Sequence, residues 1–225
     1  ASLYDKNTAY ACFNHHRYGD FKPYIFKTTD GGKSWKAIQN NLPTRGSVYS
    51  IAEDHVDPNL LFVGTEFGCY FSNNGGENWI QLKGGLPTIA VRDIEIQRRE
   101  NDLVIATFGR GFYILDDYSA LRNFKKDDIN SVAKILPIKE GLMYVESMPL
   151  GLRNKGHMGS GYYNATNPKP GAVFTYYLKD DLKKIKDIRK ESEKAKFDKN
   201  EKVYYPSLDS LRMEDNQPDP YLLFT

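Results

Sequence analysis

The sequence predicts an all-β fold in its first half, followed by further β-structure that a charged helix interrupts. Three observations predict this class. The chain has 16 Tyr, 12 Phe and 18 Gly among 225 residues, a composition that favours strands and tight turns. A turn with paired glycines and a tryptophan recurs after 44 residues, from Trp35 to Trp79. Short apolar runs of strand length precede each turn.

The composition excludes several classes of protein. With 40% hydrophobic and 27% charged residues, the chain is expected to be globular rather than disordered. The formal net charge of +2 gives no electrostatic reason to expect nucleic acid or an anionic membrane as partner. Two cysteines exclude a disulfide-rich scaffold and a four-thiolate zinc site. No apolar run approaches the roughly 20 residues that span a bilayer. Because residue 1 is Ala, we expect a cut or processed N-terminus.

The repeat is clearest in two segments, residues 24–35 and 69–79. A decayed third copy covers residues 112–117 and lacks the tryptophan, with Leu121 near its place. The matched turn positions are Asp30, Asn74 and Asp117, then Gly32 and Gly76, then Trp35 and Trp79.

Each repeat unit is expected to hold up to four antiparallel strands, called A to D in chain order. We predict A strands over residues 48–52 and 91–96, and B strands over 8–13, 60–65 and 103–107. The C strands are expected in the repeats themselves, and short D strands are expected to carry the tryptophan. A period near 44 with four strands is the size of one β-propeller blade. Residues 1–124 are therefore predicted to form about three blades.

The turn over residues 28–35 has a physical logic. Asp30 can accept backbone N–H groups from the turn that it opens. The glycines allow positive φ, and Trp35 can fold its apolar face onto the blade. We assign a structural role to these positions in all copies: Thr28, Asp30, Gly32, Trp35, Ser72, Asn74, Gly76, Trp79 and Asp117.

The turn matches the Asp-box or BNR pattern, Ser/Thr-x-Asp-x-Gly-x-Ser/Thr-Trp. Residues 28–35 match it in full, and residues 72–79 match it with Asn at 74 and 78. Together with the longer segments 16–35, 61–68 and 101–117, these turns resemble the Asp-box β-propellers of the sortilin-like and bacterial BNR "glycosyl hydrolase" group, common in Bacteroidetes. The resemblance implies a ring of seven to ten blades, of which this chain supplies the last few. It also implies an extracellular, periplasmic or cell-surface location, and the remaining blades, on the parent chain or another chain, as partners.

The second half is expected to leave the propeller. Residues 125–150 are predicted to be connecting strands, and residues 151–225 part of a β-sandwich with a Gly/Pro loop and a charged helix over 180–200. A second short helix is expected over residues 207–214. In relatives, segments similar to 171–178 and 220–224 lie in the sandwich.

Blade geometry places the B–C loops and the D-to-A connections at the end opposite the tryptophan turns. The loop in the first blade is long and rich in His and Arg, which makes it the best candidate site for a ligand. We expect the following side chains to gather there: Asn14, His15, His16, Arg17, Asp20, Arg45, Glu66 and Arg110. Ser50 and Asp93 occupy equivalent positions on A strands and are candidates to line the channel.

Other readings of these residues stay open. His15 and His16 could ligate zinc, but no carboxylate–histidine motif accompanies them, so no metal or cofactor is expected. Arg17 and Asp20 could pair and brace the loop. A glycosidase needs two carboxylates about 5–10 Å apart, and Glu66 with Asp20, or with Asp93, are the candidates. The arginines do not reproduce a sialidase site. Cys12 and Cys69 are expected to be packed, with a disulfide between them left open.

The expected function is therefore binding of a protein, peptide or glycan through the loop-rich rim of an exported propeller. Two alternatives remain: a glycoside hydrolase acting on a polysaccharide, and a structural subunit of an envelope or secretion assembly. No catalytic pair is demonstrable from the sequence, so the prediction leans against an enzyme.

Overall fold

The computed structural model describes residues 1–141, 143, 165–166, 168, 170–221 and 223. The chain divides into two compact units, Ala1–Ile129 with Lys134–Tyr177, and Asn130–Ala133 with Leu178–Thr225. Residues 142 and 144–150 of the expected connecting strands, and most of the expected Gly/Pro loop, lie outside the described residues.

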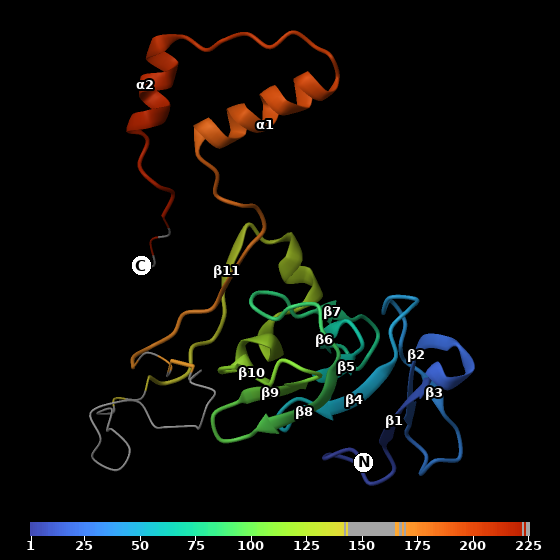
Figure 1. The fold of residues 1–225 in the computed structure, drawn as a ribbon. Helices are drawn as coiled ribbons and strands as arrows, with labels where there is room; N and C mark the ends of the chain where they lie inside the picture. Colours follow the sequence, from blue (N-terminus) through green and yellow to red (C-terminus); the bar gives the residue numbers. More distant parts are fainter. Residues whose placement is uncertain (142, 144–164, 167, 169, 222, 224–225) are drawn as a thin grey trace, which may run out of the picture. The chain divides into compact units, whose positions relative to one another are not determined.

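The first unit contains three antiparallel sheets in chain order (Figure 1). Sheet one has the order β1-β2-β3, sheet two β4-β5-β6-β7, and sheet three β10-β9-β8. The strands are β1 (Ala9–His15), β2 (Asp20–Thr28), β3 (Lys36–Ala37), β4 (Val48–Glu53), β5 (Leu61–Thr65), β6 (Gly68–Ser72), β7 (Ile80–Gln81), β8 (Val91–Gln97), β9 (Asp102–Thr107) and β10 (Phe112–Leu115). Sheet two is a complete four-stranded meander, as in a propeller blade.

Two details of the expected strands are corrected. Trp35 and Trp79 do not lie on D strands, because β3 and β7 begin one residue after each tryptophan. In sheet three the chain forms the 3₁₀ helix η2 (Tyr118–Asn123) where a D strand would stand. Asp117 therefore opens a helical turn rather than a hairpin, with a left-handed φ of 43° and its carboxylate accepting the N–H of Ser119.

Backbone hydrogen bonds define two ends of the sheets. At one end, here called the turn end, each C–D turn bonds to the loop before a B strand: Gly31 N–H to Asn7, Gly75 N–H to Asn59, and Tyr118 N–H to Asn101. At the other end each B–C loop bonds to a D-to-A connection: Gly46 N–H to Phe21, Glu66 N–H to Ser47, and Phe108 N–H to Ala90. We call this second end, residues 14–22, 44–49, 66–67, 88–93 and 107–111, the loop end.

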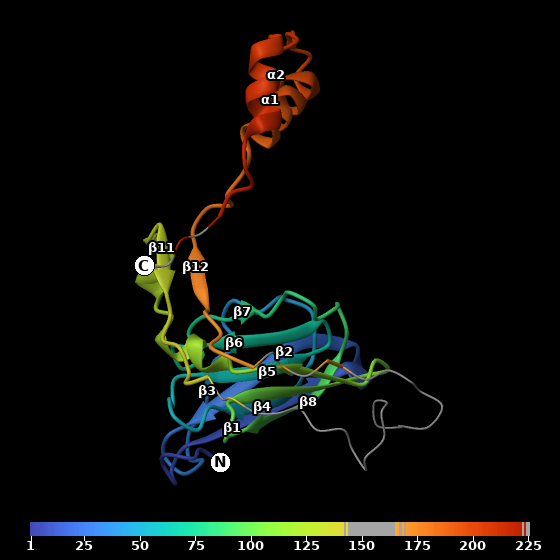
Figure 2. The same cartoon turned by 90° about the vertical axis from the view of Figure 1, so that its left-hand side faces the viewer.

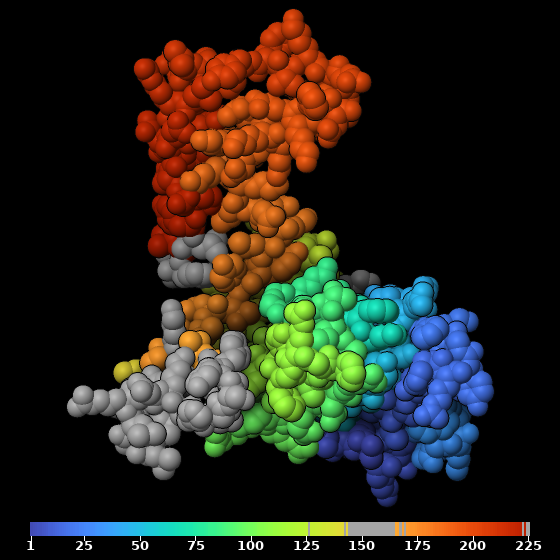
Figure 3. Space-filling view, viewed as in Figure 1, coloured from blue at the N-terminus to red at the C-terminus, as the bar shows by residue number. Residues whose placement is uncertain are grey.

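Apolar side chains from neighbouring sheets hold the first unit together. One cluster joins sheets two and three through residues such as Phe62, Cys69, Val91 and Leu103. A second cluster joins sheets one and two through Ile25, Ile38, Val63 and Trp79, among others. The space-filling view shows sheet two, in cyan to teal, between the blue first sheet and the green third sheet (Figure 3). Burial of these faces is the main source of stability.

Beyond the blades the described residues contain one more sheet, β11 (Ala133–Ile135) beside β12 (Tyr176–Leu178) (Figure 2). The expected β-sandwich is represented by these two strands alone in the described part. The predicted charged helix is confirmed as α1 (Ile185–Asp198), and the short second helix as α2 (Leu208–Asn216), which Ser207 caps by accepting the N–H of Ser210. Charged contacts join the two helices, with Arg189 bidentate to Glu214.

Candidate functional site

The loop end carries arginines stacked on aromatic rings. The guanidinium carbon of Arg92, at the start of β8, lies 4.1 Å from the ring centroid of Tyr49 and 5.2 Å from that of Phe108. Arg45 lies 5.1 Å from the ring centroid of Phe21. Each guanidinium therefore rests against an aromatic face, which orients it and leaves its edge available for hydrogen bonds.

Aromatic rings at this end are also open to solvent. Phe108 is 68% exposed, Phe67 38% and Tyr18 84%. Phe108 sits in the tight β9–β10 turn, where Thr107 donates its N–H and its hydroxyl to the carbonyl of Gly111. The turn holds Phe108 away from the core, so the sequence places an apolar ring where a ligand can reach it.

The long loop of sheet one is braced by its own side chains. The Asp20 carboxylate accepts a 2.6 Å hydrogen bond from the Tyr24 hydroxyl and a second from the N–H of Lys22. These two bonds lower the pKa of Asp20, so it stays charged. The His15 ring lies 5.4 Å from the ring of Tyr18, and His16 Nδ1 lies 2.5 Å from Asn14 Oδ1.

The remaining predicted site residues are now placed. Arg17, Arg45 and Arg110 are exposed, and Glu66 is half-buried in the β5–β6 turn. Asp20 takes its hydrogen bonds from Tyr24 and Lys22 rather than from Arg17, so the proposed brace of Arg17 with Asp20 is wrong. Ser50 is buried, whereas Asp93 is exposed and accepts the N–H of Ile94.

The turn end presents the opposite chemistry, because its polar groups are paired. Asp30 accepts the N–H of Ser34 at 2.9 Å and its hydroxyl at 2.6 Å, and Thr28 bridges the hairpin to Gly32. The bonds from Ser34 and then Thr28 lower the pKa of Asp30 to about 2. Sheet two repeats this pattern 44 residues later: Asn74 accepts the N–H of Asn78, and Ser72 accepts that of Gly76.

The two tryptophans differ sharply. Trp79 is 4% exposed, and its indole N–H donates to the carbonyl of Ile38, directly after β3. Asn41 accepts the Trp79 backbone N–H and donates to its carbonyl. Gly76 has φ +93°, and a Cβ there would come within 2.9 Å of Ile38, so only glycine fits this contact. Trp35 is 45% exposed, which corrects the expectation that it folds onto its own blade.

A buried polar cluster between sheets two and three was not found from the sequence. Asp54 has a fully buried side chain and accepts bidentate bonds from Arg122 and a 2.6 Å bond from Tyr118. Burial alone would raise the pKa of Asp54, but the bonds from Arg122, Tyr118 and the Asp57 backbone outweigh it and lower that pKa to about 2. Arg122 lies 43 residues after Trp79, close to the place of the missing tryptophan. This offset is the sequence signal from which a structural role of Arg122 could have been predicted.

A second feature missed from the sequence is an acidic cavity of about 290 Å³ beside the turn end of sheet three. Burial, and then the charge of Asp102, raise the pKa of Asp116 in its wall. Its carboxylate and amine lining comprises Glu100, Asp102, Asp116, Asp117, Glu140 and Lys139.

Several other features bear on chemistry. Within the described ranges, no group of three or more His, Cys, Asp or Glu is arranged to hold a metal ion. Cys12 and Cys69 are free, and burial raises the pKa of Cys69 to about 12. No helix in the part that the structure describes is long and apolar enough to cross a bilayer.

Comparison with known proteins gives limited similarity. No protein-family model matches the chain, and no curated protein matches it. Among solved structures, an ancestral GH74 enzyme is 23% identical with a TM-score of 0.37, over 45% of this chain and 15% of the enzyme. The GH74 xyloglucanase from Xanthomonas campestris is 14% identical with a TM-score of 0.39, over 50% of this chain and 21% of the xyloglucanase. The chain thus spans a small part of either protein, and likeness at this level identifies neither a ligand nor a reaction.

Proposed function

We propose that the chain contributes Asp-box blades to an exported β-propeller protein and binds a carbohydrate ligand at its loop end. The observation that carries this proposal is the stack of Tyr49, Arg92 and Phe108, which combines an oriented hydrogen-bond donor with an open aromatic face. Aromatic rings supply rigid apolar area at low entropic cost, and sugars present flat C–H faces to such rings. Arginine supplies the hydrogen bonds that fix orientation.

The test compares two exposed phenylalanines. Phe108→Ala removes the ring at the loop end, and Phe197→Ala removes a 75% exposed ring on α1 as the matched control. Polysaccharides that slow the migration of the wild-type chain in affinity electrophoresis are identified first. The same polysaccharides are then titrated against both variants. We expect Phe108→Ala to weaken binding about tenfold, and Phe197→Ala to leave it unchanged. The proposal would be refuted if no polysaccharide slowed the wild-type chain. It would also be refuted if both variants lost the same amount of polysaccharide affinity.

A glycoside hydrolase is the second candidate, and the acidic cavity favours it. Acid–base catalysis in a glycosidase requires a carboxyl group that keeps its proton, and the pKa of Asp116, which lines the cavity with Asp102, is raised by burial. Of the pair expected from the sequence, Glu66 and Asp20, the Asp20 carboxylate accepts the Tyr24 hydroxyl and has a lowered pKa, which does not suit the proton donor of the pair. Turnover of labelled glycans that Asp116→Asn abolishes and Glu66→Gln spares would place catalysis in the cavity. Absence of turnover in the wild-type chain would contradict the hydrolase.

We also propose that a preceding blade is a partner of sheet one, on the parent chain or another chain. The support is internal: Trp79 is covered by the segment after β3, and Trp35 stands in the same place of its repeat without such a cover. Fusing a second copy of residues 8–47 upstream of the chain should protect Trp35 from acrylamide quenching in a Trp79→Phe background. Unchanged quenching would argue against this surface as a blade contact.

A further inference from the structure

The arginines of the loop end lack carboxylate partners. Arg17, Arg45, Arg92 and Arg110 form no ion pair with any of the described residues. Elsewhere, the Arg122 and Arg189 guanidinium groups are each bidentate to a carboxylate. An arginine without a partner keeps its full capacity to bind an external anion.

The loop end also has an excess of positive charge. Its five segments hold five cationic side chains, namely Arg17, Lys22, Arg45, Arg92 and Arg110, and three acidic ones, namely Asp20, Glu66 and Asp93. Of the acidic groups, Asp20 already accepts bonds from Tyr24 and Lys22. The formal net charge of the whole chain is also only +2, so the positive excess is concentrated at the loop end. An anionic ligand that approaches this end would meet a positive field.

Stacking prepares Arg92 to bind a planar anion. With the ring centroid of Tyr49 at 4.1 Å and that of Phe108 at 5.2 Å, the guanidinium loses little further freedom when it pairs with a carboxylate. Carboxylates match the forked donor geometry of arginine, and the exposed ring of Phe108 lies beside this donor. The site therefore offers a carboxylate contact and an apolar stacking contact next to each other.

We infer that the ligand of the loop end is an acidic saccharide, whose carboxylate pairs with Arg92 while a sugar ring rests on Phe108. This inference rests on the proposed carbohydrate binding and specifies the chemistry of the ligand. An acidic peptide would satisfy the arginines, but it would leave the open rings of Phe108 and Phe67 without a repeating flat partner.

The test uses the full chain and three uronic-acid polymers: polygalacturonate, alginate and hyaluronan. Each is titrated beside its methyl ester, which keeps the sugar rings and removes the negative charge. We expect at least one acidic polymer to bind about tenfold more tightly than its ester, with affinity falling as salt rises. Arg92→Gln should remove most of that preference. Arg98→Gln, an exposed arginine in the β8–β9 turn at the opposite end, should keep it.

The outcomes separate this inference from the proposed function. Equal binding of acid and ester, or binding of neutral glycans alone, would leave carbohydrate binding intact and overturn the acidic ligand. Poly-L-glutamate bound as tightly as the uronic-acid polymers would show that charge alone suffices, and would also overturn it. Absence of binding to every glycan would remove both proposals together.

Discussion

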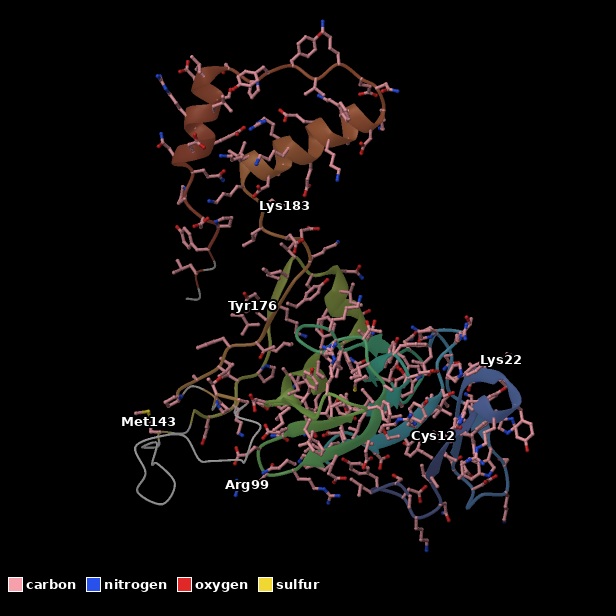
Figure 4. All side chains as sticks on the ribbon, in the orientation of Figure 1. Cys12, Lys22, Arg99, Met143, Tyr176 and Lys183 are labelled. Carbon is pink, nitrogen blue, oxygen red and sulfur yellow. The ribbon has the colours of Figure 1, made fainter. Side chains whose placement is uncertain are left out.

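The two ends of the same sheets are built on different principles. At the turn end, side-chain oxygens accept hydrogen bonds from nearby groups: Asp30 from the backbone N–H of Ser34, Asn74 from the backbone N–H of Asn78, and Asp54 from the Arg122 guanidinium. At the loop end, arginines rest on aromatic rings and have no acidic partner among the described residues. Figure 4 labels Arg99 in the β8–β9 turn and Lys22 at the start of β2, and places them on opposite sides of the strand-rich unit. The difference separates hydrogen-bonded side chains that link the sheets at the turn end from unpaired arginines at the loop end, which is where we propose that a ligand binds.

The largest effect is expected from removing the Asp54 carboxylate, which tests whether the turn end stabilises the sheets. Asp54→Ala leaves Arg122 and Tyr118 without their acceptor in a buried site, which typically costs about 4 kcal/mol. We expect a large loss in the free energy of unfolding, measured by urea titration. The exposed Asp127 serves as control, and Asp127→Ala should change little. A similar stability for both variants would show that the cluster does not hold sheets two and three together.

Acid should weaken the buried cluster around Asp54. Because the folded-state pKa of Asp54 is lowered from 3.8 to about 2, its contribution is complete above pH 3.8 and is lost as the pH falls toward 2. The shift corresponds to about 2 kcal/mol of stability. The unfolding free energy of the wild-type chain is measured across this range and compared with that of Asp54→Asn. Parallel pH curves for the two proteins would contradict the assignment.

The two tryptophans sharpen the comparison within the repeat. Trp79→Phe loses the indole bond to Ile38 and part of a buried volume, a cost of about 2 kcal/mol. Trp35→Phe changes a ring that is 45% exposed, so the expected cost is below about 0.5 kcal/mol. Thermal unfolding of both variants is the measurement. Equal losses would mean that the exposed ring contributes as much as the buried one.

The smallest effect on stability is expected at the loop end. The double change His16→Ala and Arg17→Ala removes two exposed side chains, so unfolding should shift by less than about 0.5 kcal/mol. The polysaccharide in affinity electrophoresis should nevertheless slow this variant less than the wild-type chain, because both side chains lie in the long loop of the loop end. Calorimetry and affinity electrophoresis on one preparation give both values. Unchanged retention would remove this loop from the binding surface.

The repeat made most of the strand-rich unit predictable. Strands β4, β5, β8 and β9 lie within a residue or two of their expected bounds, since apolar alternation and the recurring turn act locally. The position of the loop end follows from antiparallel order alone. The burial of Trp35 was predicted wrongly because the cover of each tryptophan comes from the preceding sheet, a contact that the turn itself does not encode.

The buried cluster shows a different limit. Asp54 and Arg122 are 68 residues apart, and only Arg122, which stands near the tryptophan position of the third copy, is related to the repeat. Nor does the sequence indicate that Arg92 lies against both Tyr49 and Phe108, because the contact with Tyr49 depends on how two sheets lie side by side. Contacts within one repeat could be predicted, whereas the contacts between sheets that create the candidate site could not.

The most direct test of the division between the two ends measures stability and glycan affinity on the same two variants. Asn41→Ala removes the side-chain bonds to Trp79, and Phe108→Ala removes the open ring of the loop end. We predict that Asn41→Ala lowers the unfolding free energy by about 1 kcal/mol and leaves glycan affinity unchanged. Phe108→Ala should leave the unfolding free energy unchanged and lower the glycan affinity. Loss of affinity in Asn41→Ala together with full affinity in Phe108→Ala would contradict the account.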